Sequence, residues 1–176
     1  MSTPETLPHR VDYRRLASQR RDVNAGIELA RLPRVAGETV AGSDTDRAVA
    51  VSLRFTEDSQ RRVVVAGSIE TTLTLMCQRC LTSFDRPMHL TVAGVVVGDD
   101  EAAANVPRAD EPILADSDML DLHALVSDEL LLGLPSVARC DRAECVQQYR
   151  PRAPESDRED AKDNPFAVLS RLKHGD

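Results

Sequence analysis

One stretch of sequence decides the fold: Val63–Leu75, which consists of VVVAGSIETTLTL. It is rich in β-branched side chains, which favour the pleated backbone of a strand. The stretch is too long for one flat strand, and Gly67 is the natural place for a bulge or a bend. We therefore predict a long strand that is interrupted or bent at Gly67.

Extended segments flank this stretch on both sides. Before it, Ala48–Phe55 alternates apolar with small or polar residues, which is the pattern of a half-buried strand. After it, Met88–Val97 is again rich in β-branched residues. Because the links between the three segments are short, they predict an antiparallel meander rather than parallel crossover units.

The N-terminal part of the chain gives weaker signals. Asp12–Arg21 predicts a short helix, Gly26–Leu32 alternates like a strand that Pro33 ends, and Val35–Val40 predicts a short extended piece. With the central segments, these predict an α+β fold whose sheet is an antiparallel meander or partial barrel of about five to six strands.

A helix is predicted after the sheet and is expected to cover it. Asp118 is a suitable N-cap, and Asp121 falls in the first turn, where negative charge suits the helix dipole. Gly133 and Pro135 end the helix. Apolar residues at helical spacing can face a core, namely Leu122, Leu125, Val126 and Leu130, with Glu129 on the same side.

These elements divide the chain into four predicted parts. Residues 1–25 form an N-terminal arm or short helix, and residues 26–149 form a single α+β core domain. Within that domain, residues 98–117 have the composition of a mobile acidic loop. Residues 150–163 are a linker rich in proline and charge, and residues 164–176 are a short C-terminal helical tail.

Charge is unevenly distributed along the chain. The net charge is −7, and residues 98–121 alone carry eight acids against one base, Arg108. The remaining residues are therefore formally neutral, which is compatible with a basic face elsewhere. Aromatic residues make up only 3% of the chain, which argues against binding nucleic acid by base stacking.

The sequence indicates a cytoplasmic protein without catalytic machinery. No stretch approaches the ~20 apolar residues that span a bilayer, and the N-terminus lacks the apolar segment of a signal peptide. We expect no membrane association, and reduced cysteines. The chain has no phosphate-binding glycine loop and no serine nucleophile motif. We therefore expect neither an enzyme nor a small-molecule substrate.

The four cysteines carry the strongest chemical signal. Cys77-x2-Cys80 follows a predicted strand, and Cys140-x4-Cys145 follows the predicted helix. A Cys-x2-Cys loop lets both thiolates reach one tetrahedral zinc ion, and the wider second spacing is also common among zinc ligands. The pattern predicts a structural zinc site. The alternative is four reduced thiols, some of them buried as small apolar residues.

Two chemical alternatives are weaker. A redox role for Cys77 and Cys80 is conceivable because Arg79 could lower a thiol pKa, but turn-forming residues follow the motif, whereas thioredoxin-like chemistry needs a helix there. His123, next to several carboxylates, could belong to a metal or acid–base site. We favour a solvated helix flank for this histidine.

Arginines are the candidates for contact with RNA, because their guanidinium groups can hold phosphates bidentately. The alternative is a solvated, charged helix in which Asp12 and Asp22 are interleaved with the arginines. The candidates are Arg10, Arg14, Arg15, Arg20 and Arg21 near the N-terminus, and Arg79 and Arg86 around the cysteine turn.

Three motifs together resemble the large ribosomal RNA subunit accumulation protein family (YceD-like). They are Leu75–Leu81 with Phe84, the run from Asp121 through Asp128–Pro135 to Cys140 and Cys145, and Asn164–Leu169 with Leu172-Lys173. The resemblance extends from about Ile27 to the C-terminus. It implies a non-catalytic factor in ribosome biogenesis that supports synthesis, processing or stability of 23S rRNA. In the family pattern the position of Cys140 can be His, which suits a metal ligand.

The implied partners are 23S rRNA or its precursor and large-subunit ribosomal proteins. We expect the junction of the two cysteine pairs, with Arg79 and Arg86, to meet rRNA or a ribosomal protein. An alternative is an acidic adaptor for a basic ribosomal protein, in which the acidic loop and the predicted helix Asn164–Leu172, with Asn164 and Phe166, contact the partner. A cysteine-based redox sensor is a third hypothesis.

Overall fold

The computed structural model describes residues 6–44 and 46–148, and the chain forms two compact units, Met1–Cys140 and Asp141–Asp176. The second unit contains α5 (Ala143–Gln148). The elements of the first unit are, in order, β1 (Arg10–Asp12), α1 (Tyr13–Ser18), β2 (Asp22–Glu28), η1 (Leu29–Arg31), α2 (Pro33–Ala36), β3 (Ala48–Glu57), β4 (Val63–Met76), β5 (Ser83–Val97), α3 (Asp100–Ala104), β6 (Pro112–Leu114), β7 (Met119–Asp121) and α4 (Leu122–Leu132).

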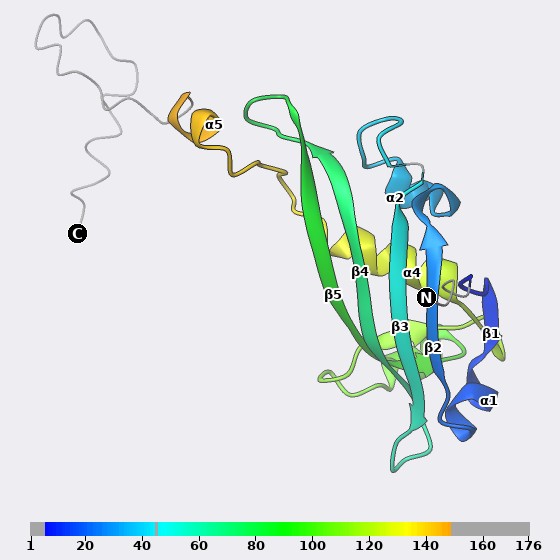
Figure 1. Ribbon diagram of the computed structural model, residues 1–176. Helices are drawn as coiled ribbons and strands as arrows, with labels where there is room; N and C mark the ends of the chain where they lie inside the picture. The colour runs from blue at the N-terminus through cyan, green and yellow to red at the C-terminus, as the bar shows by residue number, and fades with distance from the viewer. Residues whose placement is uncertain (1–5, 45, 149–176) are drawn as a thin grey trace, which may run out of the picture. The chain divides into compact units, whose positions relative to one another are not determined.

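The first unit is built on a curled five-stranded sheet in the order β2-β3-β4-β5-β6 (Figure 1). Neighbouring strands from β2 to β5 are antiparallel, as the predicted meander requires, whereas β6 pairs with β5 in parallel. The predicted α+β partial barrel is therefore confirmed, with a mixed rather than purely antiparallel sheet. A second, two-stranded sheet joins β1 to β7.

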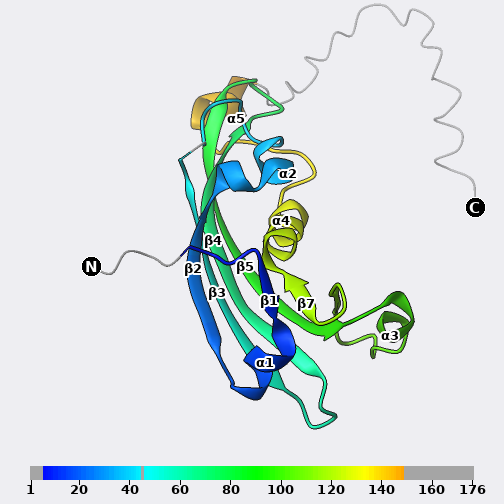
Figure 2. The ribbon, with the colours of Figure 1, turned by 90° about the vertical axis from the view of Figure 1, so that its right-hand side faces the viewer.

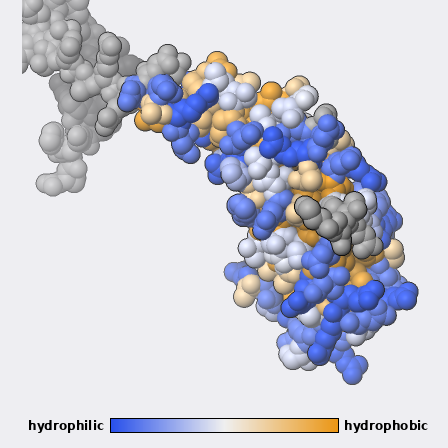
Figure 3. Space-filling view, in the orientation of Figure 1, coloured by the Kyte–Doolittle hydropathy of each residue, from blue (hydrophilic) through white to orange (hydrophobic). Residues whose placement is uncertain are grey.

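Among the described residues, the helices of the first unit gather on one face of the curled sheet. Figure 2 shows α1, α2 and α4 gathered on the same side. Burial follows the strand period of two, because alternate residues of β3 point to the covered face. The opposite face is the one turned to the viewer in Figure 3, where hydrophilic residues predominate at the lower end, over the β3–β4 turn. The core between sheet and helix includes Leu53, Phe55, Val65, Ile69, Leu73, Val92, Leu122, Val126 and Leu130.

Of the two alternatives predicted at Gly67, a bulge or a bend, the bulge is wrong, because β4 pairs without interruption along its whole length. Gly67 lies opposite Leu53 on β3 and opposite Val92 on β5 in a regular register. A Cβ atom at Gly67 would lie 1.9 Å from the carbonyl oxygen of Ser52. The glycine therefore permits a close approach of two backbones within an unbroken strand.

The segment after β2 is helical where extended structure was predicted. The strand ends at Glu28, η1 follows, and α2 begins at Pro33 in place of the extended Val35–Val40 piece. Proline suits the first turn of a helix, because its fixed φ is helical and no hydrogen bond is lost there. The earlier helix is confirmed as α1, with the Asp12 carboxylate accepting a hydrogen bond from the Arg15 N–H at 2.9 Å.

The acidic segment 98–117, predicted as a mobile loop, contains α3 and β6. The covering helix also begins later than predicted. Its N-cap is Asp121, whose carboxylate accepts from the Ala124 N–H at 2.9 Å, whereas Asp118 pairs with Arg14. Residues before Asp121 instead pair with β1 as β7, an interaction between distant parts of the chain.

Several predictions fall on residues that the structure does not describe. The linker 150–163 and the C-terminal helical tail 164–176 lie outside the described residues, so the proposed domain boundaries stay predictions. Among the described helices, none is both long and apolar enough to cross a membrane.

Replacement of Gly67 by alanine should destabilise the first unit by about 3 kcal/mol, because β3 and β4 would have to separate. Chemical denaturation measures this change. Gly98→Ala is the matched control, since its added Cβ would meet only the Ser117 carbonyl oxygen at 3.9 Å. Equal stability of the two variants would contradict the steric argument.

Candidate metal centre

The first cysteine pair lies at the tip of the β4–β5 hairpin. Met76 and Ser83 form the last paired positions of the two strands, so Cys77–Thr82 is the connecting turn. The Cys77 N–H donates to the Thr82 carbonyl at 3.0 Å, and the Leu81 N–H donates to the Cys77 carbonyl at 2.9 Å. These two bonds fold the turn back so that both thiols can point to one side.

Leu81 takes the left-handed backbone conformation that this turn requires. Its φ is 56°, in the left-handed region that glycine usually occupies. The sequence has no glycine in the turn. Leu81 adopts this conformation itself, with a side chain that is 70% exposed. The turn geometry is therefore compatible with a non-glycine residue.

Two hydrogen bonds to backbone carbonyls, which no local sequence pattern encodes, bring Cys140 to the turn. After α4 the chain returns along the hairpin tip, where the Gln78 N–H donates to the Ala138 carbonyl at 2.8 Å. The Arg79 guanidinium donates through Nη2 to the Cys140 carbonyl at 3.0 Å. Both contacts fix the returning segment on the turn.

Three thiols of the first unit converge on one point. The Sγ atoms of Cys80 and Cys140 are 3.8 Å apart, and those of Cys77, Cys80 and Cys140 all lie within 4.8 Å of one another. In a tetrahedral zinc–thiolate site with bonds of about 2.3 Å, neighbouring sulfurs are separated by roughly 3.8 Å. Cys77 and Cys140 are buried and Cys80 is half-buried. The geometry of these three thiols fits a metal ion.

Cys145, the fourth predicted ligand, belongs to the second unit. It lies in α5, five residues after Cys140 in the sequence. Its participation therefore stays a prediction from the spacing of the two cysteines.

The site favours the thiolate form that a metal requires. The N–H of Cys140, whose nitrogen is 3.4 Å from the Cys77 Sγ, is the main cause that lowers the pKa of Cys77 to about 5. Burial acts in the opposite direction, and the N–H groups of Cys80 and Arg79, with the Cys80 thiol, lower the pKa further. The redox hypothesis attributed a lowered thiol pKa to the charge of Arg79. In the structure, backbone N–H groups lower the pKa of Cys77 instead.

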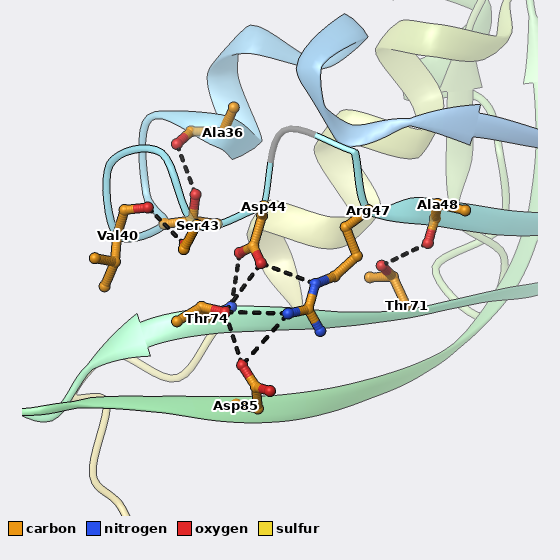
Figure 4. Close-up of polar contacts among 10 residues, drawn as sticks. Ala36, Val40, Ser43, Asp44, Arg47, Ala48, Thr71, Thr74 and Asp85 are labelled. Carbon is orange, nitrogen blue, oxygen red and sulfur yellow. Dashed lines mark hydrogen bonds and ion pairs between the residues drawn. The ribbon is translucent and has the colours of Figure 1, made fainter.

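A buried carboxylate that the sequence did not single out fastens the loop before β3 onto the hairpin (Figure 4). Asp44 accepts from the Thr74 N–H at 2.8 Å and pairs with Arg47 Nε at 2.8 Å. The Thr74 hydroxyl lies 2.9 Å from Asp44 and 2.7 Å from Asp85. Because Thr74 and Asp85 are paired close to the cysteine turn, this network stiffens its base.

The predicted RNA-contact arginines do not gather in one place. Arg14 pairs with Asp118 at 3.1 Å, and Arg79 bonds to Cys140. Arg86 lies in β5, and its buried Nε has no hydrogen-bond partner among the described residues. The remaining N-terminal candidates are exposed, namely Arg10, Arg15, Arg20 and Arg21. Asn164 and Phe166 lie outside the described residues.

His123 has a structural environment. Its Nε2 is 3.2 Å from the Leu7 carbonyl, and its ring meets that of His9 edge-on with centroids 4.6 Å apart. His9 in turn lies 3.4 Å from Asp121. These contacts connect the N-terminal segment to α4. Because they join residues far apart in the sequence, no local pattern predicts them. His123 is half-buried rather than the fully solvated flank that we favoured.

Comparisons with known proteins give two findings. The sequence pattern of the family described as large ribosomal RNA subunit accumulation protein YceD matches residues 65–173, which contain all four cysteines. A relative of that name from Haemophilus influenzae is 31% identical over 172 residues, which covers 95% of this chain and 96% of the relative. No solved structure matches the chain.

The lowered pKa of Cys77 predicts how this thiol titrates in the metal-free protein. Its thiolate absorbance in the ultraviolet should persist until the pH falls to about 5. Because the unfolded thiol titrates near ~8.5, stability should rise with pH between these values and lose this contribution below pH 5. Cys77→Ser should abolish the low-pH titration. Titration of every thiol in the ordinary range would contradict the proposed N–H donors.

Proposed function

Because the chain belongs to the family of large ribosomal RNA subunit accumulation protein YceD, we propose that it is a non-catalytic ribosome-biogenesis factor in the bacterial cytoplasm. It supports synthesis, processing or stability of 23S rRNA. The observation that carries the proposal is the similarity to the relative along nearly the whole of both chains. A resemblance confined to one motif would carry much less.

A structural zinc ion is part of the proposal. Three convergent thiols, one with a lowered pKa, support thiolate coordination by Cys77, Cys80 and Cys140. Cys145 is the proposed fourth ligand, because five residues of chain reach at most about 17 Å and so keep its thiol near Cys140. A site closed by four cysteines has no open coordination position, which agrees with a structural rather than catalytic role.

RNA or a large-subunit ribosomal protein is the proposed partner. Arg15, Arg20 and Arg21 are exposed, and no carboxylate pairs with them among the described residues. Such guanidinium groups are available for phosphate contacts without breaking an internal ion pair. Because the acidic residues are concentrated in one segment, an N-terminal basic surface is compatible with the negative net charge.

A thiol redox sensor is the second candidate function, and the lowered pKa of Cys77 favours it. The complete burial of this thiol opposes it, because oxidants need access to the sulfur. Bound zinc would also hold the thiolates and protect them from oxidation. The metal measurement below therefore separates the two functions.

Depletion of the protein from cells should lower the ratio of 23S to 16S rRNA, measured on total RNA. Re-expression of the natural chain should restore the ratio. A form with Arg15, Arg20 and Arg21 all changed to Gln should restore it only in part if these residues contact rRNA. An unchanged ratio under several growth conditions would refute the biogenesis proposal.

The purified protein should contain equimolar zinc, measured by elemental analysis. The double variant Cys77→Ser, Cys80→Ser should lose it and should unfold at lower denaturant concentration, because metal binding adds to folding free energy. Ser83→Ala, which changes an exposed residue next to the turn, is the control. A natural chain without metal, together with an undiminished stability of the double variant, would remove the zinc site.

A further inference from the structure

The first unit contains a groove between β6 and α4 that the biogenesis proposal does not use. We call it the β6–α4 groove, a hollow of about 510 Å³ at the edge of the main sheet. Its walls are apolar: Ile113 and Leu114 lie on the strand side, and Leu131 and Leu132 lie on the helix side. Leu114 is 55% exposed and Leu132 is 75% exposed. Such large exposed apolar side chains around a hollow mark an interaction surface.

Four carboxylates line the same groove, and two of them are neutralised within the unit. Asp128 pairs with Arg34 of α2, and Asp121 lies 4.0 Å from Arg10 Nε and caps α4. Glu111 and Glu129 complete the set. Among the described residues, no cation pairs with Glu111 or Glu129.

Glu111 and Glu129 act on each other across the groove. Burial raises the pKa of Glu129, and the negative charges of Glu111 and Asp128 raise it further. Both the desolvation and the repulsion would be relieved by a cation placed between the two carboxylates. The groove thus combines apolar walls with an unbalanced negative charge.

We propose that the β6–α4 groove binds a basic, amphipathic segment of a protein partner. A lysine or arginine of that segment lies between Glu111 and Glu129, and an apolar side chain covers Leu114 and Leu132. Charge complementarity selects this occupant: the negative charge repels RNA phosphates, whereas the apolar walls require more than a free cation.

The edge strand also limits how the partner binds. β6 is only three residues long, and its first residue, Pro112, has no N–H to donate. An added β-strand would therefore form few backbone bonds with this edge. Side-chain packing of an amphipathic helix into the groove is the geometry that remains.

This inference rests on the proposed function, because it supplies a surface for the protein partner of a biogenesis factor. The probe is a labelled synthetic peptide in which leucines and lysines alternate at helical spacing, so that a helix has one apolar and one basic face. The full-length protein is titrated into this peptide, and binding is followed by fluorescence anisotropy. Counterparts with Glu in place of Lys, or Ser in place of Leu, test the charge and the apolar face separately. The lysine–leucine peptide should bind, and both counterparts should bind at least about tenfold more weakly.

Matched protein variants locate the binding. The double variant Glu111→Gln, Glu129→Gln should bind the lysine–leucine peptide about tenfold more weakly than the natural protein. Glu70→Gln with Glu101→Gln removes the same charge from exposed residues outside the groove and should leave binding unchanged. Leu114→Ser with Leu132→Ser should also weaken binding, and these exposed positions should not affect folding.

Three results would overturn the assignment. The first is equal weakening by the two glutamate pairs, which indicates unspecific attraction, and the second is equal binding of all peptides. The third is direct binding of an rRNA fragment to the protein that Leu114→Ser with Leu132→Ser weakens. Self-association that Leu114→Ser, Leu132→Ser abolishes, seen by sedimentation, would assign the groove to a second copy instead. The rRNA ratio in depleted cells is measured independently. A lowered ratio with a failed peptide test would leave the biogenesis function intact and refute only the groove.

Discussion

The β4–β5 hairpin is the constraint on which the rest of the structure depends. Its two strands pair without a break from Val63 opposite Val96 to Met76 opposite Ser83. This register places alternate residues of both strands in the core under α4 and puts the cysteine turn at the far end of the ladder. A slip of one residue would turn the core side chains outward and displace Cys77 from the segment that carries Cys140.

The candidate metal centre is shaped mainly by backbone groups. The N–H of Cys140 stabilises the Cys77 thiolate, and the contacts of Gln78 and Arg79 hold the returning chain in place. Asp44 then ties the base of the same hairpin to the loop before β3. The thiols are consequently organised by interactions that extend well beyond the two cysteine motifs, which suits a clamp that stabilises the fold.

Charge separates the proposed partner surfaces. Arg15, Arg20 and Arg21 are exposed and pair with no carboxylate among the described residues, whereas acids of α4 and the segment before β6 line an apolar groove. A factor that meets both RNA and a basic protein needs such a division, because one surface cannot attract phosphates and cations equally. Because the residues outside 98–121 sum to no net charge, composition alone does not reveal this division.

The sequence by itself determined the central strands, the covering helix and the cysteine set, because periodicity and ligand spacing are local properties. It failed where distant partners decided the outcome: Met119–Asp121 became β7 through pairing with β1, and residues 112–114 joined β5 as a parallel strand. The lowered pKa of Cys77 and the repulsion between Glu111 and Glu129 likewise depend on tertiary structure. Hydrogen bonds and charges across long sequence separations exist only once the chain has folded, so no local pattern encodes them.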